Sequence, residues 1–380
     1  MILALALTAF LSVQAEDDGR TKANPEPQTF AQVEANLERA YDWLLTNQKA
    51  DGSFGEGHLQ QLHELGFSVE TFYAWQVGAH SLACMALLYA PVTEERDRAL
   101  RRGLDWLCTT RPPKRGSNWD IDYVWGGLYG FVALVEAASH ERFADEVWQE
   151  RLSKGAETYF DILERNQIPT GGWAYYDDPI YSQRPKWGTS FTTALVLPAL
   201  KGGEELGWVA DPKIRARATK YVGRCALPNG AWEYDLNPVP RFRGGEHINR
   251  KKGSLSRIQV CNWALAKVGE KKITHERIRE GLEDFFRDHR FLDVAYMKPR
   301  PHEAYYANSG YFYLFGHYYA AEVIELLPAD ERESWHRRLR PHLTKVQRKN
   351  GSATDFLIGE YNVVAGTAFL ALSLEKGRPE

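Results

Sequence analysis

The chain of 380 residues is poor in methionine, cysteine and net charge, with 3 Met, 4 Cys and a formal net charge of −3. So small a net charge gives no support to a nucleic-acid-binding function. The cysteines form no Cys-x-x-Cys pair and no Cys/His ligand spacing, so we expect no metal site and no cofactor. No Pro/Gly-rich linker or change in composition divides the chain, so we expect one domain.

An apolar run of 15 residues opens the chain and ends at Ala15, ahead of the acidic residues 16–18. The run is too short to span a membrane, whereas its small residues at the end fit cleavage by signal peptidase. We therefore expect residues 1–15 to be a signal peptide and residues 16–29 a flexible lead-in. The mature protein would then be exported, to the periplasm or the extracellular space. A frayed N-terminal helix is the alternative for residues 1–15.

One short pattern recurs four times, and we call it the glycine mark. Its copies read Asp51-Gly52-Ser53-Phe54, Thr170-Gly171-Gly172-Trp173, Asn229-Gly230-Ala231-Trp232 and Asn350-Gly351-Ser352-Ala353. A glutamine precedes the glycine by four residues in three copies, at Gln48, Gln167 and Gln347, whereas Ala226 stands there in the remaining copy. Successive glycines lie 119, 59 and 121 residues apart, which indicates a repeat of about 60 residues. A degenerate copy lies at 115–119, and residues 288–293 have lost the pattern.

Two kinds of helix alternate between the marks. One kind is amphipathic with a charged face, and the other is apolar nearly all round. The amphipathic helices are predicted at 33–47, 96–109, 144–166, 212–225, 276–288 and 333–349, and the apolar helices at 77–89, 124–138, 189–200, 255–268, 310–327 and 362–374. Because a helix without a polar face must be buried, we predict an all-α (α/α)6 toroid over residues 30–376, with the apolar helices inside.

Each mark has a local structural reason. Its glycine follows the last turn of an outer helix, where a residue with positive φ is favoured. The aromatic residue that follows, Phe54, Trp173 or Trp232, can pack back against the helix that has just ended.

The predicted ring also separates the cysteines. Cys84 and Cys261 fall on inner helices at opposite sides, and Cys108 and Cys225 fall on outer helices that are not neighbours. Because a disulfide needs Cα atoms within about 7 Å, we predict four free and mostly buried thiols.

The glycine marks resemble the QW repeat of the squalene cyclase and protein prenyltransferase superfamily, whose members are α/α toroids. In that family the Gln and the aromatic residue tie consecutive helices together. Gln48 with Phe54 and Gln167 with Trp173 fit this pattern, and the resemblance covers about residues 30–376. The resemblance implies a fold more strongly than a function, because the same toroid hosts polysaccharide lyases, glycosidases and protein-binding domains.

The links between the predicted helices differ in length. Inner-to-outer links are mostly short, such as 90–94 and 328–332, whereas the outer-to-inner links 55–76, 174–188, 233–254 and 298–309 are long. Long loops on a rigid scaffold commonly carry function. We expect all of them at one rim of the ring, above the N-termini of the inner helices, whose dipoles favour anionic groups.

Aromatic, acidic and basic side chains gather at this rim. The catalytic candidates are Asp120, Asp122, His247, Arg257 and Tyr305, and the substrate-binding candidates are Trp75, Tyr123, Trp125, Tyr176, Trp187, His302, Tyr306 and Tyr311. The last loop adds Asp355, Glu360, Tyr361 and Asn362 to the expected mouth.

These candidates also have ordinary structural explanations. Asp120 and Asp122 could be charges favoured by a helix N-terminus, and the basic run 241–252 could be a solvated loop face. The tyrosines could serve packing. His80 and His317 lie within inner helices, where the default is a core histidine whose nitrogens have hydrogen-bond partners.

The resemblance implies a protein that binds or processes an isoprenoid-like ligand. Cyclases of that family protonate their substrate with a DxDD motif at the start of an inner helix, and aromatic faces stabilise the resulting carbocation. Asp120-Ile121-Asp122-Tyr123 resembles half of that motif and lacks its last Asp. The family's prenyltransferases hold zinc with Asp, Cys and His, and no matching trio stands out here.

The side chains of the rim allow two other functions. In a polysaccharide lyase Arg257 could neutralise a uronate while His247 or Tyr305 takes a proton, and in a glycoside hydrolase two carboxyls could act as acid and base. A non-catalytic scaffold that holds another protein is the third hypothesis. A deep apolar cavity would favour isoprenoids, an open polar cleft would favour glycans, and a plugged centre would favour the scaffold.

Overall fold

The computed structural model describes residues 24–60, 67–111, 113, 122–174, 187–236, 247–357 and 359–379. The predicted signal peptide lies outside these residues. The helices are α1 (Phe30–Thr46), α2 (Val69–Tyr89), α3 (Glu94–Thr109), α4 (Val124–Ala138), α5 (Glu146–Asn166), α6 (Ser190–Glu205), α7 (Lys213–Arg224), α8 (Leu255–Lys267), α9 (His275–Arg287), α10 (Arg290–Ala295), α11 (Phe312–Ile324), α12 (Ala329–Thr344) and α13 (Gly359–Lys376). In the described part of the chain there are isolated β-bridges but no strand.

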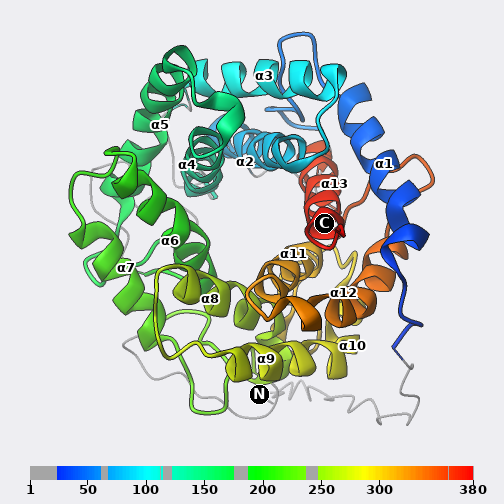
Figure 1. Cartoon of the computed structure of the whole chain (residues 1–380). Helices are drawn as coiled ribbons and strands as arrows, with labels where there is room; N and C mark the ends of the chain where they lie inside the picture. Colours follow the sequence, from blue (N-terminus) through cyan, green and yellow to red (C-terminus); the bar gives the residue numbers. More distant parts are fainter. Residues whose placement is uncertain are drawn as a thin grey trace, which may run out of the picture.

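The long helices form two concentric rings (Figure 1). The inner ring runs α2, α4, α6, α8, α11 and α13, and α13 closes it by packing against α2. The outer ring holds α1, α3, α5, α7, α9 and α12. This arrangement confirms the predicted (α/α)6 toroid and the assignment of apolar helices to its inside.

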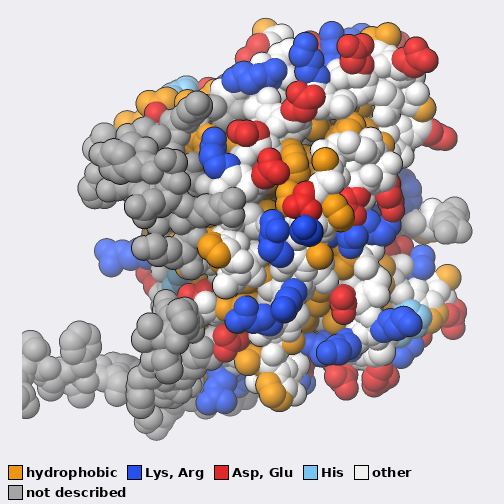
Figure 2. All heavy atoms as spheres, turned by 90° about the vertical axis from the view of Figure 1, so that its left-hand side faces the viewer, with side chains coloured by type: hydrophobic (Ala, Val, Ile, Leu, Met, Phe, Trp, Pro, Cys, Tyr) orange, Lys and Arg blue, Asp and Glu red, His pale blue; other side chains and the backbone are white. Residues whose placement is uncertain are grey.

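Burial explains why the two kinds of helix differ. The inner helix α11 is buried from Phe312 to Ile324, because it contacts helices on both sides and an outer helix behind it. The outer helix α3 buries one stripe, which includes Ala99, Leu104 and Cys108. Figure 2 shows an outer face of the ring, where Lys and Arg are interspersed with Asp and Glu. In the described part of the chain no helix is both long and apolar enough to cross a bilayer.

Helix α2 begins at Val69, eight residues before the predicted start at 77. The predicted loop 55–76 is therefore too long. The start is fixed by Ser68, whose side chain accepts a hydrogen bond from the backbone N–H of Thr71 and so satisfies a free donor of the first turn. The added turns place Phe72 and Trp75 on the inner ring.

The glycines of all four marks have positive φ, at 90° for Gly52, 105° for Gly171, 84° for Gly230 and 93° for Gly351, as predicted. The structure adds a second reason for glycine. A Cβ on Gly52 would lie 2.6 Å from the carbonyl oxygen of Arg102 on α3, so the next outer helix approaches too closely for any side chain.

The glutamines of the marks join neighbouring outer helices. Gln48 Nε2 donates to the carbonyl oxygen of Gly52 at 2.9 Å and to that of Ala99 on α3 at 2.8 Å. Gln167 bonds Ile214 on α7 in the same way, and Gln347 bonds Asn36 on α1. The last of these bonds closes the outer ring.

The aromatic position of each mark is bound to the following inner helix. The backbone N–H of Phe54 donates to His80 Nδ1 on α2 at 3.1 Å, and that of Trp173 donates to Thr193 Oγ1 on α6 at 3.0 Å. His80 Nε2 also lies 2.9 Å from the carbonyl oxygen of Gly103 on α3, so both of its nitrogens have partners. Each of the three marks that contains a glutamine therefore ties its own outer helix to the next inner helix and the next outer helix.

The two ends of the helical ring meet at one side chain. Arg340 on α12 is buried, and its guanidinium donates to the carbonyl oxygen of Gln28 at 3.0 Å and to that of Gly377 at 2.7 Å. The four cysteines are all free and buried, as predicted.

Candidate functional site

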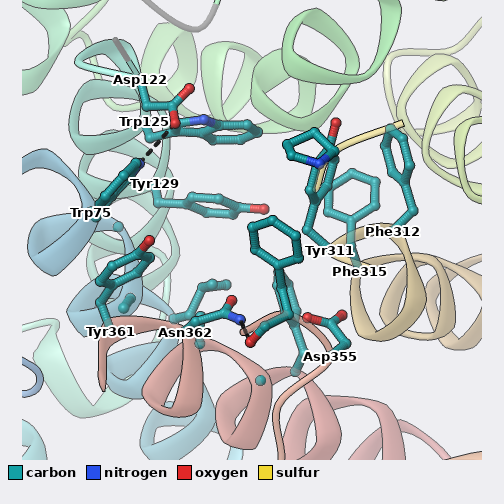
Figure 3. A pocket seen from close by; sticks show the side chains of 18 of the residues that line it. Trp75, Asp122, Trp125, Tyr129, Tyr311, Phe312, Phe315, Asp355, Tyr361 and Asn362 are labelled. Atoms are coloured by element: carbon teal, nitrogen blue, oxygen red, sulfur yellow. Dashed lines mark hydrogen bonds between the residues drawn. The ribbon is translucent and has the colours of Figure 1, made fainter. Parts of the chain in front are cut away.

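A cavity of about 420 Å³ opens among the N-terminal ends of the inner helices. It is lined by Phe67, Trp75, Gly78, Ala79, Leu82, Asp122, Trp125, Tyr129, Phe191, Pro301, His302, Tyr311, Phe312, Phe315, Asp355, Phe356, Tyr361, Asn362, Ala365, Gly366 and Phe369. Most of these side chains are aromatic or aliphatic, and Figure 3 shows the rings around the space. The cavity lies at the rim that the loop lengths predict.

Asp122 lies two residues before the start of α4 and provides the carboxyl on one wall of the cavity. Its Oδ2 accepts a hydrogen bond from Trp75 Nε1 at 3.0 Å (Figure 3), and the side chain of Trp125 provides a second bond. Burial raises the pKa of the Asp122 carboxyl to about 6, although both indoles counteract this by favouring the carboxylate. Asp122 also has a φ of 61°, a left-handed conformation that Asp tolerates better than most residues.

Asp355 lies across the pocket from Asp122, in the segment before α13 (Figure 3). Its Oδ2 accepts a hydrogen bond from the backbone N–H of Leu314 at 2.7 Å. Burial raises the pKa of Asp355 to about 7, with backbone hydrogen bonds opposing the rise. The cavity thus holds two carboxyls that can each gain or lose a proton near neutral pH.

His302 lies at a third wall of the cavity, beside two tyrosine hydroxyl groups. Its Nδ1 donates to the carbonyl oxygen of Ala307 at 2.8 Å, which leaves the single lone pair of Nε2 to accept from Tyr311 at 3.1 Å, and the hydroxyl of Tyr234 lies 3.4 Å from the same nitrogen. Burial lowers the pKa of His302, so the ring is held neutral in this arrangement.

Five of the thirteen predicted site residues line the cavity: Asp122, Trp75, Trp125, His302 and Tyr311. Asp120 and Tyr176 lie outside the described residues.

The other six candidates do not line the cavity: His247, Arg257, Tyr305, Tyr123, Trp187 and Tyr306. Arg257 is buried and donates to the carbonyl oxygens of Trp232 and Ile248. Tyr305 is 41% exposed, and His247 Nδ1 accepts from the backbone N–H of Asn249. Arg257 and His247 thus hold loop backbone groups, whereas Tyr305 faces solvent.

Sequence reasoning missed most of the aromatic wall. Tyr129, Phe191, Phe312, Phe315 and Phe369 all lie on inner helices, with Phe191 and Phe312 in the first turns of α6 and α11. Their apolar pattern predicts burial, and it does not distinguish a ring that faces a cavity from one that packs against a neighbour. Asp355, Tyr361 and Asn362 were expected at the mouth, and the ring of Tyr361 stacks on Trp75 with a centroid separation of 4.6 Å.

The described lining holds acidic groups and aromatic faces but no lysine or arginine. Aromatic faces attract cations, and a buried carboxyl with a raised pKa can donate a proton. The arrangement suits chemistry in which positive charge develops on an apolar ligand.

No protein-family model matches the sequence, and no curated protein matches it. Solved structures share the fold at low identity. The type II terpene cyclase MstE from Scytonema is 16% identical, with a TM-score of 0.53, over 92% of this chain and 98% of that one. A variant of that cyclase was solved in complex with its substrate, geranylgeranyl dihydroxybenzoate.

Two other solved structures concern carbohydrate chemistry. An alpha-amylase from Clostridium perfringens is 11% identical, with a TM-score of 0.58, over 90% of this chain and 98% of that one. A possible member of the GH105 family from Klebsiella pneumoniae is 13% identical, with a TM-score of 0.52, over 93% and 95%. At these identities the likeness shows the fold alone, and the choice of chemistry depends on the cavity.

Proposed function

We propose that the protein is an isoprenoid cyclase that starts its reaction by protonating a carbon–carbon double bond, with Asp122 as the acid. The observation that carries this proposal is the half-buried carboxyl of Asp122, which is hydrogen-bonded by Trp75 on the wall of a mostly aromatic cavity and whose pKa is raised to about 6 by desolvation. An alkene is a weak base, so a carboxylic acid that is poorly solvated and close to an apolar chain is the group it needs.

The residues of the cavity allow a balanced reaction. The Asp122 carboxylic acid gives its proton to one alkene carbon and leaves a cation on the other. The next double bond of the ligand attacks this cation and closes a ring. A C–H proton is finally lost to a base, for which Asp355 stands across the cavity, so the product is an isomer of the substrate.

Aromatic faces would stabilise the cation while it moves along the ligand. Trp75, Trp125, Tyr129, Phe315 and Phe369 come from four helices around the space. A cation over such a ring gains about 0.5–2 kcal/mol, and more when water is excluded. The volume of about 420 Å³ lies in the usual range for small-molecule sites.

The sequence motif supports the same residue. Asp122 holds the third position of the incomplete DxDD pattern, and buried Tyr123 replaces the last Asp. We take the glycine marks as divergent copies of the QW repeat. A polysaccharide lyase is less well supported, because the described lining lacks the cation that would neutralise a uronate.

The test is an incubation of the purified protein with linear polyprenes such as squalene, geranylgeraniol and a geranylgeranyl arene, followed by mass spectrometry. We expect cyclic isomers of unchanged mass in H2O. In D2O the products should carry one deuterium at the carbon that Asp122 protonates.

Asp122→Asn should reduce turnover at least about 100-fold without lowering the melting temperature, because burial raises the pKa of this carboxyl and an amide at the same place carries no charge. Asp161→Asn is the matched control, because that carboxyl is 71% exposed on α5 and should not affect turnover. If no polyprene is converted, or if Asp122→Asn turns over like the wild type, the proposal fails, and binding of anionic glycans becomes the next measurement.

A further inference from the structure

Three buried histidines meet between the inner and outer rings, away from the cavity. His289 lies between α9 and α10, His317 on α11 and His342 on α12, with relative exposures of 2%, 0% and 1%. One ring nitrogen from each lies within 4.8 Å of the others. None of the three lines the cavity described above.

The hydrogen bonds define which nitrogens carry protons. His317 Nδ1 lies 2.6 Å from the carbonyl oxygen of Tyr313, which can only accept, so Nδ1 is the protonated nitrogen. His289 Nδ1 lies 3.2 Å from a carboxylate oxygen of Asp293 and donates to it. Both Nε2 atoms are then left with lone pairs, and these two atoms face each other at 3.0 Å. Two facing lone pairs repel unless a cation or a proton lies between them.

His342 completes the set. Neither of its nitrogens has a hydrogen-bond partner, although the side chain is buried. Its ring lies against that of His289 with a centroid separation of 3.6 Å. A buried polar atom without a partner costs about 1–3 kcal/mol, so this ring needs an explanation that packing does not supply.

The histidines occupy the place where a glycine mark is missing. The first mark joins the end of α1 to the next inner helix through Phe54 and His80, and to the next outer helix through Gln48. After α9 the pattern is absent. There His289 faces His317 on the next inner helix and His342 on the next outer helix, which are the equivalent partners.

We propose that His289, His317 and His342 bind one divalent transition-metal ion, with Zn²⁺ as the best match, and that this ion joins α10, α11 and α12 in place of the missing mark. Zn–N bonds of about 2.0–2.1 Å separate two tetrahedral ligand nitrogens by about 3.3 Å, close to the 3.0 Å between the two Nε2 atoms. The three ligand nitrogens lie within 4.8 Å of one another, so binding of one ion requires the His342 nitrogen to move toward the other two.

The surroundings of the histidines are those of metal ligands. Metal-bound imidazoles usually donate their other N–H to a carboxylate or a backbone carbonyl, as His289 and His317 do here. Asp293 is itself held by Lys345. The three histidines are buried and none of them lines the cavity, which favours a structural role for the ion. Three protein nitrogens leave the fourth position of a tetrahedral ion to water.

A proton shared by His289 and His317 is the competing explanation, and metal binding distinguishes the two. The untagged protein is dialysed against a weak chelator, and its metal content is measured. The protein stripped by a strong chelator is then titrated with Zn²⁺ while its melting temperature is followed. We expect one Zn²⁺ per chain and a melting temperature that rises on titration.

His342→Leu is the informative variant. Leu has about the volume of His but no ligand nitrogen, and the substitution breaks no hydrogen bond of the His342 side chain. It should weaken Zn²⁺ binding at least about 100-fold and abolish the thermal response. His275→Ala removes an exposed histidine on α9 and should behave as the wild type.

Two results would overturn the proposal: a stripped wild type whose melting temperature ignores Zn²⁺, or a His342→Leu variant that binds Zn²⁺ as the wild type does. If His342→Leu does not fold, Co²⁺ added to the stripped wild type decides. Strong visible bands of a four-coordinate site support the proposal, and the weak spectrum of hydrated Co²⁺ refutes it.

Discussion

Asp355→Asn should make the protein more stable at neutral pH, although it removes a charged residue from a hydrogen-bonded position. The Asp355 side chain accepts from the backbone N–H of Leu314, and an Asn carbonyl can accept the same bond. The substitution therefore changes the ability to ionise and little else. Asp355 is only 4% exposed, so solvent screens its charge poorly.

The magnitude follows from the pKa of this group. Burial raises it from 3.8 to about 7 in the folded chain. The folded state therefore holds a proton that the unfolded state releases between about pH 4 and 7, and the stability that this proton provides below pH 4 is lost over that interval. A difference of about three units between the folded and unfolded pKa values corresponds to about 4 kcal/mol of unfolding free energy. This is the largest gain in stability expected for Asp355→Asn at pH 8.

Urea unfolding of both proteins at pH 4, 5, 6, 7 and 8 measures this effect. The two free energies of unfolding should agree near pH 4 and separate by up to about 1.4 kcal/mol per pH unit until pH 7. Asp51→Asn is the control, because the pKa of Asp51 is lowered in the folded chain: burial is the largest single influence and raises it, but the hydrogen bonds from Ser53 and the charge of Lys49 together outweigh burial. Asn229 and Asn350 already stand at the equivalent position of two other marks. A constant difference between Asp355→Asn and the wild type across this range would refute the reasoning.

Three further predictions test the marks and the acid. Gly171→Ala should lower the free energy of unfolding in urea more than Gly207→Ala does. Both glycines have positive φ, but only at Gly171 would a Cβ press against a backbone carbonyl. Equal losses of unfolding free energy would count against close approach as the reason for glycine. Gln167→Ala should lower the free energy of unfolding by about 1–3 kcal/mol, since two buried carbonyls lose their donor. A loss below about 0.5 kcal/mol in the same assay would contradict the role of Gln167 in joining α5 to α7. The kcat/KM for cyclisation should fall about tenfold per pH unit above about pH 6 as Asp122 ionises, and a flat profile between pH 5 and 8 would exclude it as the acid.

The fold could be predicted because its determinants are local. The period of the marks and the difference between one-faced and all-round apolar helices are properties of short segments. The start of α2 was misplaced because the Ser68 cap, itself a local signal, lies inside a segment interpreted as a loop.

The site depends on contacts between distant segments, and the sequence predicts these less well. Asp122 could be found, because it stands at the start of an inner helix in a partial motif. Its partner Trp75 is 47 residues away, and their hydrogen bond depends on how α2 packs beside α4. His289 in the link between α9 and α10, His317 on α11 and His342 on α12 show no ligand spacing, so only the folded ring reveals them together.

The contacts of Arg340 indicate that the chain could be circularly permuted. Because one guanidinium holds the carbonyl oxygens of Gln28 and Gly377, a short linker could join these two points without moving a helix. The ring would then be covalently continuous and could be opened elsewhere, for example in the short exposed turn between α2 and α3 at residues 91–93. A circular permutant cut there should fold to the same toroid, since every contact between neighbouring helices is kept.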